Sequence, residues 1–222
     1  MKILIADDHA ALRRGLRQIL ALGFRGAIFG EAGNFEETMA QLDKEPWDVL
    51  VLDIFMPGRS GLDVLREIEV IKPDLPVLVL SSAPEEQMAA RVLRAGASGC
   101  LNKRAAPEEL AQAVKKVASG GTYVSAKLGE MLAADLIRPH AAPHEQLSDR
   151  EFQVMQMLAA GKSVKEIAAD LALSPKTVST FHTRLMGKLR LQNDVELVRY
   201  ALEHNLVESS LLPPPRIPPF EM

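Results

Sequence analysis

Residues 49–68 read VLVLDIFMPGRSGLDVLREI, and this stretch joins a short apolar run to a turn and an amphipathic segment. The run Val49–Leu52 has the Val and Leu content of a buried strand. After the turn signal Pro57-Gly58, apolar residues recur at spacings of three and four through Gly61–Ile68, as in a helix that covers a core. The stretch therefore predicts a strand followed by a helix.

The same unit recurs throughout the first half of the chain. Each apolar run with strand character is followed by a segment with helical spacing. Five such pairs in succession predict a doubly wound, five-stranded parallel sheet with helices on both faces. The expected strands are Lys2–Ala6, Ala27–Gly30, Val49–Leu52, Val77–Leu80 and Gly99–Leu101, and the expected helices are His9–Leu20, Phe35–Asp43, Gly61–Ile68, Glu85–Ala95 and Pro107–Ala118.

After Gly120-Gly121 the alternation stops and the pattern becomes purely helical. Thr122–Asp135 contains one candidate helix, and the stretch RPHAAPHEQ at 138–146 has the composition of a linker. Capping residues and apolar spacing then predict four helices, at Asp149–Ala160, Val164–Leu171, Pro175 to about Leu191, and about Val195–His204. We therefore expect an α/β domain at 1–120, a linker at 121–145, an all-α domain at 146–208 and a Pro-rich flexible tail at 209–222.

Composition narrows the class of protein. A single cysteine excludes an internal disulfide framework and favours a reducing compartment. Two acids within the first eight residues argue against a signal peptide, and no apolar run reaches the ~18 residues of a membrane span. The expectation is a soluble, cytoplasmic protein. No acid lies between Leu171 and Asn193, a stretch that carries four cations, which suggests a polyanionic partner.

Polar residues follow the expected strands of the first domain. Asp7 and Asp8 come after the first strand and Asp53 after the third, and these strands are neighbours at the switch point of a doubly wound sheet. Three converging carboxylates repel one another unless a cation joins them, and all-oxygen ligands suit Mg²⁺. Ser81, at the end of the fourth strand, and Lys103, after the fifth, can reach the same crevice.

Strand-end acids also cap helices, and for Asp8 alone capping is an equal alternative. For the five polar residues together, a shared site is the better interpretation. The neighbouring His9 is interpreted as a helix-start residue rather than a metal ligand, because Mg²⁺ prefers oxygen.

The segments IADDHAALRRGL, VLDIFMPGRSGLDVLREI, VLVLSSA and AGASGCLNK occur in the order and spacing of a known family. Residues 1–120 closely resemble the receiver domain of two-component response regulators, which has a flavodoxin-like fold. The resemblance implies phosphorylation by a sensor histidine kinase with Mg²⁺ as cofactor. It assigns Asp53 as the phosphoacceptor, Asp7 and Asp8 as the Mg²⁺ acids, the backbone carbonyl of Phe55 as the third metal-binding group, Ser81 as the switch hydroxyl and Lys103 as the phosphate-binding lysine.

One position departs from the family. Receivers usually have Tyr or Phe three residues before the lysine, and this chain has Cys100, which cannot signal as a swinging ring would. This leaves open a DNA-binding regulator whose receiver acts independently of phosphorylation. A phosphatase with Asp53 as a transient nucleophile is disfavoured, because no acid follows within three residues. We therefore expect that the protein is not an enzyme.

The sequence LSDREFQVMQMLAAGKSVKEIAADLALSPKTVSTFHTRLMGKL resembles the LuxR-type helix-turn-helix of the NarL/FixJ group of response regulators. The short turn Ala172–Ser174 has helix-turn-helix spacing, and the following helix carries small hydroxyl residues and cations that suit phosphates and base edges. A generic four-helix protein-binding domain is the alternative. By this resemblance Ser179, Thr180 and Thr183 face the major groove, and the candidate phosphate contacts are Lys165, Lys176, Arg184 and Lys188. Thr177, on the outer face of the same helix, is a further candidate DNA-binding residue.

The family often has a basic residue where Ser179 stands and His where Phe181 stands, so the resemblance does not give the base preference. As a whole it implies a phosphorylation-activated transcription regulator. Such a protein binds double-stranded promoter DNA on paired half-sites, as a homodimer when phosphorylated. No membrane partner is expected.

Overall fold

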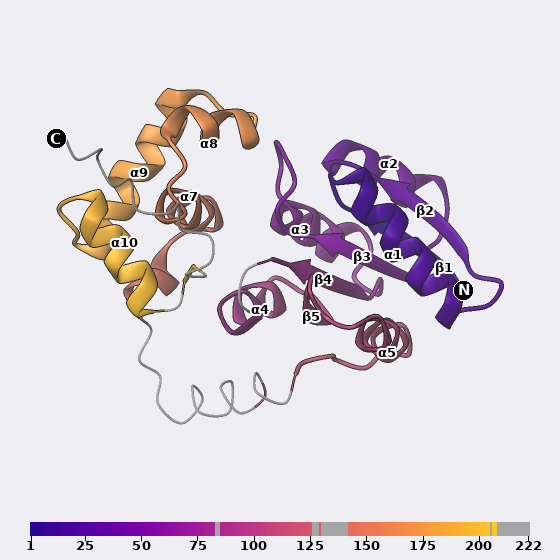
Figure 1. The fold of residues 1–222 in the computed structure, drawn as a ribbon. Helices are drawn as coiled ribbons and strands as arrows, with labels where there is room; N and C mark the ends of the chain where they lie inside the picture. Colours follow the sequence, from indigo (N-terminus) through magenta and orange to yellow (C-terminus); the bar gives the residue numbers. More distant parts are fainter. Residues whose placement is uncertain (83–84, 126–128, 130–141, 205, 208–222) are drawn as a thin grey trace, which may run out of the picture. The chain divides into compact units, whose positions relative to one another are not determined.

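The computed structural model describes residues 1–82, 85–125, 129, 142–204 and 206–207. The chain divides into two compact units, Met1–His140 and Ala141–Met222, which are described separately (Figure 1). No helix in the described residues is both long enough and apolar enough to cross a membrane.

The first unit is built on the five-stranded sheet that the sequence predicts. The strands are β1 (Lys2–Ala6), β2 (Ile28–Ala32), β3 (Val49–Asp53), β4 (Val77–Ser81) and β5 (Gly99–Asn102). Their order is β2-β1-β3-β4-β5, and every pairing is parallel. The central strands β3 and β4 are buried along their whole length, which explains their unbroken Val and Leu runs.

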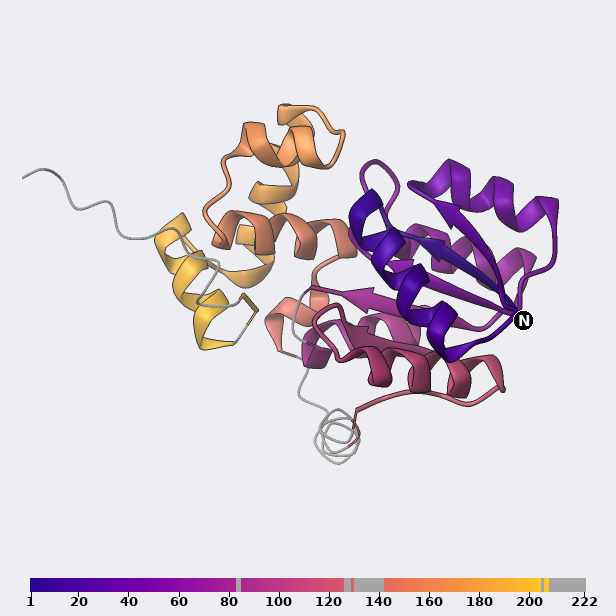
Figure 2. The ribbon, with the colours of Figure 1, turned by 45° about the vertical axis from the view of Figure 1, so that its right-hand side comes forward.

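In the part of the first unit that the structure describes, five helices cover the two faces of this sheet. They are α1 (Ala10–Gly23), α2 (Phe35–Lys44), α3 (Gly61–Ile71), α4 (Glu85–Arg94) and α5 (Pro107–Ala118). Apolar residues of α1 and α5 share a core with one face of the sheet, while α2, α3 and α4 lie on the other face (Figures 1 and 2). Helices on both faces confirm the doubly wound prediction and leave the carboxyl ends of the strands open.

The element boundaries differ from expectation at a few residues. β2 begins at Ile28 and continues to Ala32, because its backbone pairs with β1 as far as Ala6. The turn that begins α1 places His9 at the N-cap, so the helix itself starts at Ala10. Of the candidate helix at Thr122–Asp135, residues 122–125 are not helical, Gly129 is helical, and the other residues lie outside the described part of the chain.

One contact extends the β5 edge beyond the predicted sheet. Tyr123 forms an isolated parallel bridge with Gly99, and its backbone bonds to Ser98 and Cys100. A Cβ at Gly99 would lie 2.8 Å from the Tyr123 carbonyl oxygen, so this close approach requires glycine. The chain after α5 therefore returns to the sheet at Tyr123.

The described residues of the second unit form a 3-10 helix and four α-helices. They are η1 (Pro143–Gln146), α7 (Asp149–Ala159), α8 (Val164–Asp170), α9 (Pro175–Leu189) and α10 (Asp194–Glu203). Ser148, Ser163 and Ser174 cap α7, α8 and α9, each accepting a hydrogen bond from a first-turn N–H. α9 ends two residues before expectation because Arg190 adopts the left-handed conformation. η1 was not predicted.

Candidate functional site

The sheet brings its predicted polar residues to one edge. Asp7 follows the last residue of β1, Asp53 and Ser81 end β3 and β4, and Lys103 follows β5. The parallel register places Asp53 opposite Leu80, one residue before Ser81. Because all these strands point the same way, their carboxyl ends form one crevice at the switch point of the sheet.

Three charged groups meet inside this crevice. The Lys103 Nζ atom lies 2.6 Å from Asp7 Oδ2 and 2.7 Å from Asp53 Oδ2. Only 1% of each aspartate is exposed to solvent, and the lysine side chain is also largely buried. The lysine therefore bridges two buried carboxylates that come from the ends of different strands.

Burial and the attraction between Lys103 and the carboxylates shift the pKa values of these groups in opposite directions. Burial raises the pKa of the Asp53 carboxyl above its ordinary value, opposed by Lys103 and reinforced by Asp7. Burial acts to lower the pKa of the Lys103 ammonium, but the facing carboxylates of Asp53 and Asp7 outweigh it and raise that pKa. One ammonium thus faces two carboxylates, and the crevice has excess negative charge.

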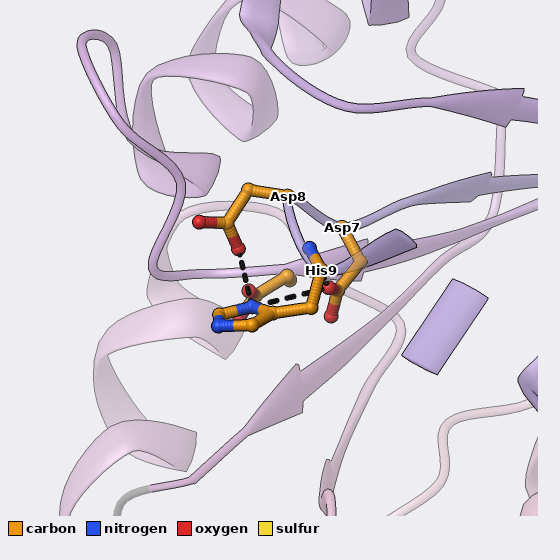
Figure 3. Close-up of side chains that lie close together, drawn as sticks. Asp7, Asp8 and His9 are labelled. Atoms are coloured by element: carbon orange, nitrogen blue, oxygen red, sulfur yellow. Dashed lines mark hydrogen bonds and ion pairs between the residues drawn. The ribbon is translucent and has the colours of Figure 1, made fainter. Parts of the chain in front are cut away.

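Asp8 and His9 line the open side of the same crevice (Figure 3). Asp8 is exposed, and its Oδ1 atom lies 2.7 Å from Nδ1 of His9. The His9 backbone N–H donates to Asp7 Oδ1 at 2.7 Å, which orients that carboxylate. Ligand atoms of Asp7, Asp8, His9 and Asp53 all lie within 4.8 Å of one another. Three carboxylates in this space are a donor set that fits Mg²⁺.

The backbone after β3 orients the third carboxylate. The N–H of Phe55 donates to Asp53 Oδ1 at 3.0 Å, which leaves Oδ2 facing Lys103. Ser81 is fully buried at the end of β4, and its carbonyl oxygen accepts a hydrogen bond from the Lys103 N–H. Each predicted pocket residue therefore lies at or next to the crevice.

Two further observations concern residues around the pocket. Arg13, which sequence reasoning did not single out, donates from Nη1 to the Asp7 carbonyl oxygen and lies 3.6 Å from Glu31. The sequence feature that could have indicated this contact is the position of Arg13 on α1, six residues after Asp7. Cys100 is fully buried in β5 opposite Val79 of β4.

The second unit presents a polar face on α9. Val178, Leu185 and Leu189 bury one side of the helix in the core. The opposite side exposes Lys176, Ser179, Thr180, Thr183, Arg184 and Lys188, with Thr177 half-buried, and Lys165 is exposed on α8. We call Lys176, Ser179, Thr180, Thr183 and Arg184 the α9 face.

The hydroxyl groups on this face are bonded to their own helix. Ser179, Thr180 and Thr183 each donate to the carbonyl oxygen four residues earlier, at 2.9 to 3.0 Å. Their protons point along the helix, while their oxygens keep lone pairs toward solvent. In this arrangement the hydroxyl groups are acceptors for outside donors.

Lys188 differs from the other cations of α9. Its Nζ atom lies 2.5 Å from Glu151 Oε2 and 3.2 Å from the Gln146 carbonyl oxygen. Glu151 is buried in the capping box that begins α7. Burial acts to raise the pKa of Glu151, but hydrogen bonds from Lys188 and Ser148 outweigh it and lower that pKa. Lys188 thus fixes α9 to the start of the second unit.

Comparison with known proteins gives matches to both units. The response regulator receiver domain matches residues 3–115, and the luxR family of bacterial regulatory proteins matches residues 145–201. The chain is 36% identical to response regulator UvrY of Escherichia coli K12 over 215 residues, which cover 96% of this chain and 98% of UvrY. It is 34% identical to response regulator GacA of Pseudomonas aeruginosa over 212 residues, or 95% and 99% of the two chains.

A solved structure is also similar over nearly the whole length. RcsB from Salmonella enterica serovar Typhimurium, bound to promoter P1flhDC in the presence of phosphomimetic BeF3-, matches with a TM-score of 0.65 and 29% identity. The match covers 95% of this chain and 98% of RcsB.

Proposed function

This chain belongs to the response regulators that join a receiver domain to a LuxR-type DNA-binding domain, and we propose that phosphorylation of Asp53 controls its binding to promoter DNA. The observation that carries the proposal is the Lys103 ammonium held between Asp7 and Asp53. This arrangement places a fixed cation beside the carboxylate that would receive a phosphoryl group.

The phosphoryl donor is a phosphohistidine of a sensor histidine kinase. A carboxylate oxygen of Asp53 attacks the phosphorus, the phosphorus–nitrogen bond breaks, and the leaving imidazole takes up a proton. The product is an acyl phosphate. Lys103 neutralises charge on the transferred group, and Phe55 N–H holds one Asp53 oxygen in place. Asp7, Asp8, Asp53 and the Phe55 carbonyl would hold Mg²⁺, which supplies further charge neutralisation.

Ser81 is the residue that senses the new group. A phosphoryl oxygen on Asp53 offers a strong acceptor to the buried Ser81 hydroxyl one residue along the neighbouring strand. Movement of Ser81 would shift the loop after β4. Cys100 of β5 replaces the usual aromatic residue and has no ring that could move. The effect of phosphorylation is therefore transmitted by movement of Ser81 at the end of β4.

We assign DNA binding to the second unit, through the α9 face. Ser179, Thr180 and Thr183, with Thr177 at the edge, read base edges in the major groove. Their outward acceptors suit the amino groups of adenine and cytosine. Lys165, Lys176 and Arg184 contact phosphates. Lys188 was expected among the phosphate contacts, but its ion pair with Glu151 favours an internal role.

The regulator binds paired half-sites in the cytoplasm as a phosphorylated homodimer, since a two-fold protein matches a two-fold operator. A solved structure described as two RcsB dimers bound to two parallel DNAs supports this arrangement. The proposed organisation is a receiver at 1–120, a linker at 121–145, a DNA-binding domain at 146–208 and a tail at 209–222.

Labelling with acetyl phosphate tests the phosphoacceptor. Wild-type protein should gain one phosphoryl group in a Mg²⁺-dependent reaction, and Asp53→Asn should gain none, because an amide cannot form the acyl phosphate. Asp74→Asn, at an exposed aspartate between α3 and β4, is the matched control and should label normally. Full labelling of Asp53→Asn would overturn the assignment, and rapid multiple turnover of the donor would indicate a phosphatase.

A further inference from the structure

His9 stands at the N-cap of α1 but does not cap the helix. In the described residues, Ser60, Ser148 and Ser174 occupy the same position on other helices, and each side chain accepts a first-turn N–H bond. The His9 side chain makes no such bond, although its backbone is extended as at the other caps. An N-cap residue that forgoes the capping bond leaves its side chain available for another contact.

The imidazole of His9 instead turns toward the acid pocket (Figure 3). Its Nδ1 atom lies 2.7 Å from Asp8 Oδ1 and 3.6 Å from Asp7 Oδ1. The two oxygens of Asp7 therefore face different groups, with Oδ2 on the Lys103 ammonium and Oδ1 on the His9 side. The lysine occupies the inner side of the pocket, and the imidazole occupies the side open to solvent.

These separations are those of donors that share one cation. Ligand atoms at bond lengths of about 2.1 Å lie about 3.0 to 3.4 Å apart when the angles at the metal are near 90° to 110°. The two nitrogen–oxygen distances at His9 bracket this range. His9 is thus close enough to act with Asp7 and Asp8 on the same ion, after small side-chain adjustments.

The type of ligand atom determines which cations a His9 ligand would bind more tightly. Mg²⁺ prefers oxygen and gains little from an imidazole, whereas later first-row ions such as Co²⁺ and Zn²⁺ accept nitrogen readily. We infer that His9 supplies a nitrogen ligand to first-row transition-metal ions in the acid pocket, so that the receiver discriminates between these ions and Mg²⁺. This inference rests on the proposed function, because it concerns the cation of the same site.

A merely positioning role for His9 predicts something different. If the imidazole only orients Asp8 through the 2.7 Å contact, its removal should weaken every divalent cation by a similar factor. A nitrogen ligand should instead change the ratio of affinities. Comparison of Co²⁺ with Mg²⁺ separates the two roles, because Co²⁺ also gives spectra that report its ligands.

The experiment titrates Co²⁺ and Mg²⁺ into the full chain by calorimetry, with paramagnetic NMR of the Co²⁺ form. We expect His9→Ala to lower the ratio of Co²⁺ to Mg²⁺ affinity about tenfold or more, and to remove a shifted imidazole resonance. His182→Ala, at a histidine on α9 paired with Asp194, is the matched control and should leave the ratio unchanged. Asp8→Asn should weaken both ions and so locate the binding in the pocket.

An unchanged ratio in His9→Ala, or a Co²⁺ spectrum without a coordinated imidazole, would overturn the inference. Different results are expected if the proposed function itself is wrong. If neither ion binds, or if Asp53 is not labelled with acetyl phosphate in the presence of Mg²⁺, the proposed Mg²⁺-dependent phosphorylation of Asp53 is wrong instead. The two failures are therefore distinguishable in the same preparations.

Discussion

In the acid pocket the Lys103 ammonium lies within 2.7 Å of carboxylate oxygens from two buried aspartates, whereas on the α9 face the cations lie in solvent. The pocket is held by strand ends whose positions the sheet register fixes. The α9 face is a helix surface whose hydroxyl groups bond only to their own backbone in the described contacts. Removing a charge should therefore change stability in the pocket and change only binding on the face.

Lys188 belongs to α9 but resembles Lys103 in its surroundings. Both ammonium groups contact a buried carboxylate, Glu151 in one case and Asp7 with Asp53 in the other. The two regions are therefore distinguished by burial of the partner, not by the domain in which a lysine lies.

Lys103→Met should have the largest effect on folding. It leaves two buried carboxylates without their cation, which costs about 2 to 4 kcal/mol of unfolding free energy. Urea unfolding with and without Mg²⁺ measures this, and Mg²⁺ should stabilise the variant at least as much as wild type. Lys115→Met, at an exposed lysine on α5, should change stability little. Equal stability of the two variants would contradict the buried-pair account.

Lys188→Met should lower the unfolding free energy at pH 7 by about 1 to 2 kcal/mol, less than Lys103→Met because its own side chain is 40% exposed. The pKa of Glu151 is lowered in the folded state, so the ion pair stabilises fully above the ordinary glutamate pKa. This stabilisation should disappear as the pH falls through the lowered folded-state pKa. Wild type and Lys188→Met should therefore converge in acid, which pH-dependent unfolding will show.

Arg184 and Lys188 should differ in how much each contributes to the salt dependence of DNA binding. Arg184→Met should reduce the salt dependence of DNA affinity by about one unit of slope, because a phosphate contact is lost. Lys188→Met should leave that slope unchanged, since its charge is already paired with Glu151. A reduced slope in Lys188→Met would indicate that Lys188 contacts a DNA phosphate.

The smallest effects are expected for single groups of the α9 face. Thr183→Ala should alter base preference by about 1 kcal/mol at one position, because an outward acceptor is lost. Lys176→Met should weaken all sequences alike by a similar amount. Affinity measured on a library of binding sites separates the two patterns. Uniform loss in both variants would contradict the division of the face into base and phosphate contacts.

The fold and the pocket were predictable because their residues obey simple periodicities. Short Val and Leu runs between amphipathic segments predict the parallel sheet, and its order then brings Asp7 and Asp53 to one edge. The exact ends of the elements were not predictable. β2 continues to Ala32 because pairing with β1 overrides its own weak signal, and Arg190 ends α9 through backbone conformation.

The contacts that sequence reasoning missed are those of long, flexible side chains. Lys188 reads as an exposed cation on a helix, and nothing local indicates that Glu151, 37 residues earlier, lies within its reach. Arg13 follows the acid pair by one and a half helical turns, so its contact with the Asp7 carbonyl depends on how α1 leaves the sheet. Such pairings arise only after the elements pack.

We propose that phosphorylation of one buried carboxylate in the first unit governs DNA binding by the second. Genome-wide DNA occupancy tests it most directly, with wild type and Asp53→Ala expressed at equal abundance in cells that lack the native protein. The claim predicts discrete binding sites for wild type under the inducing stimulus and loss of that occupancy in Asp53→Ala. The same sites bound to the same extent by both proteins would contradict it and would indicate a receiver that acts without phosphorylation.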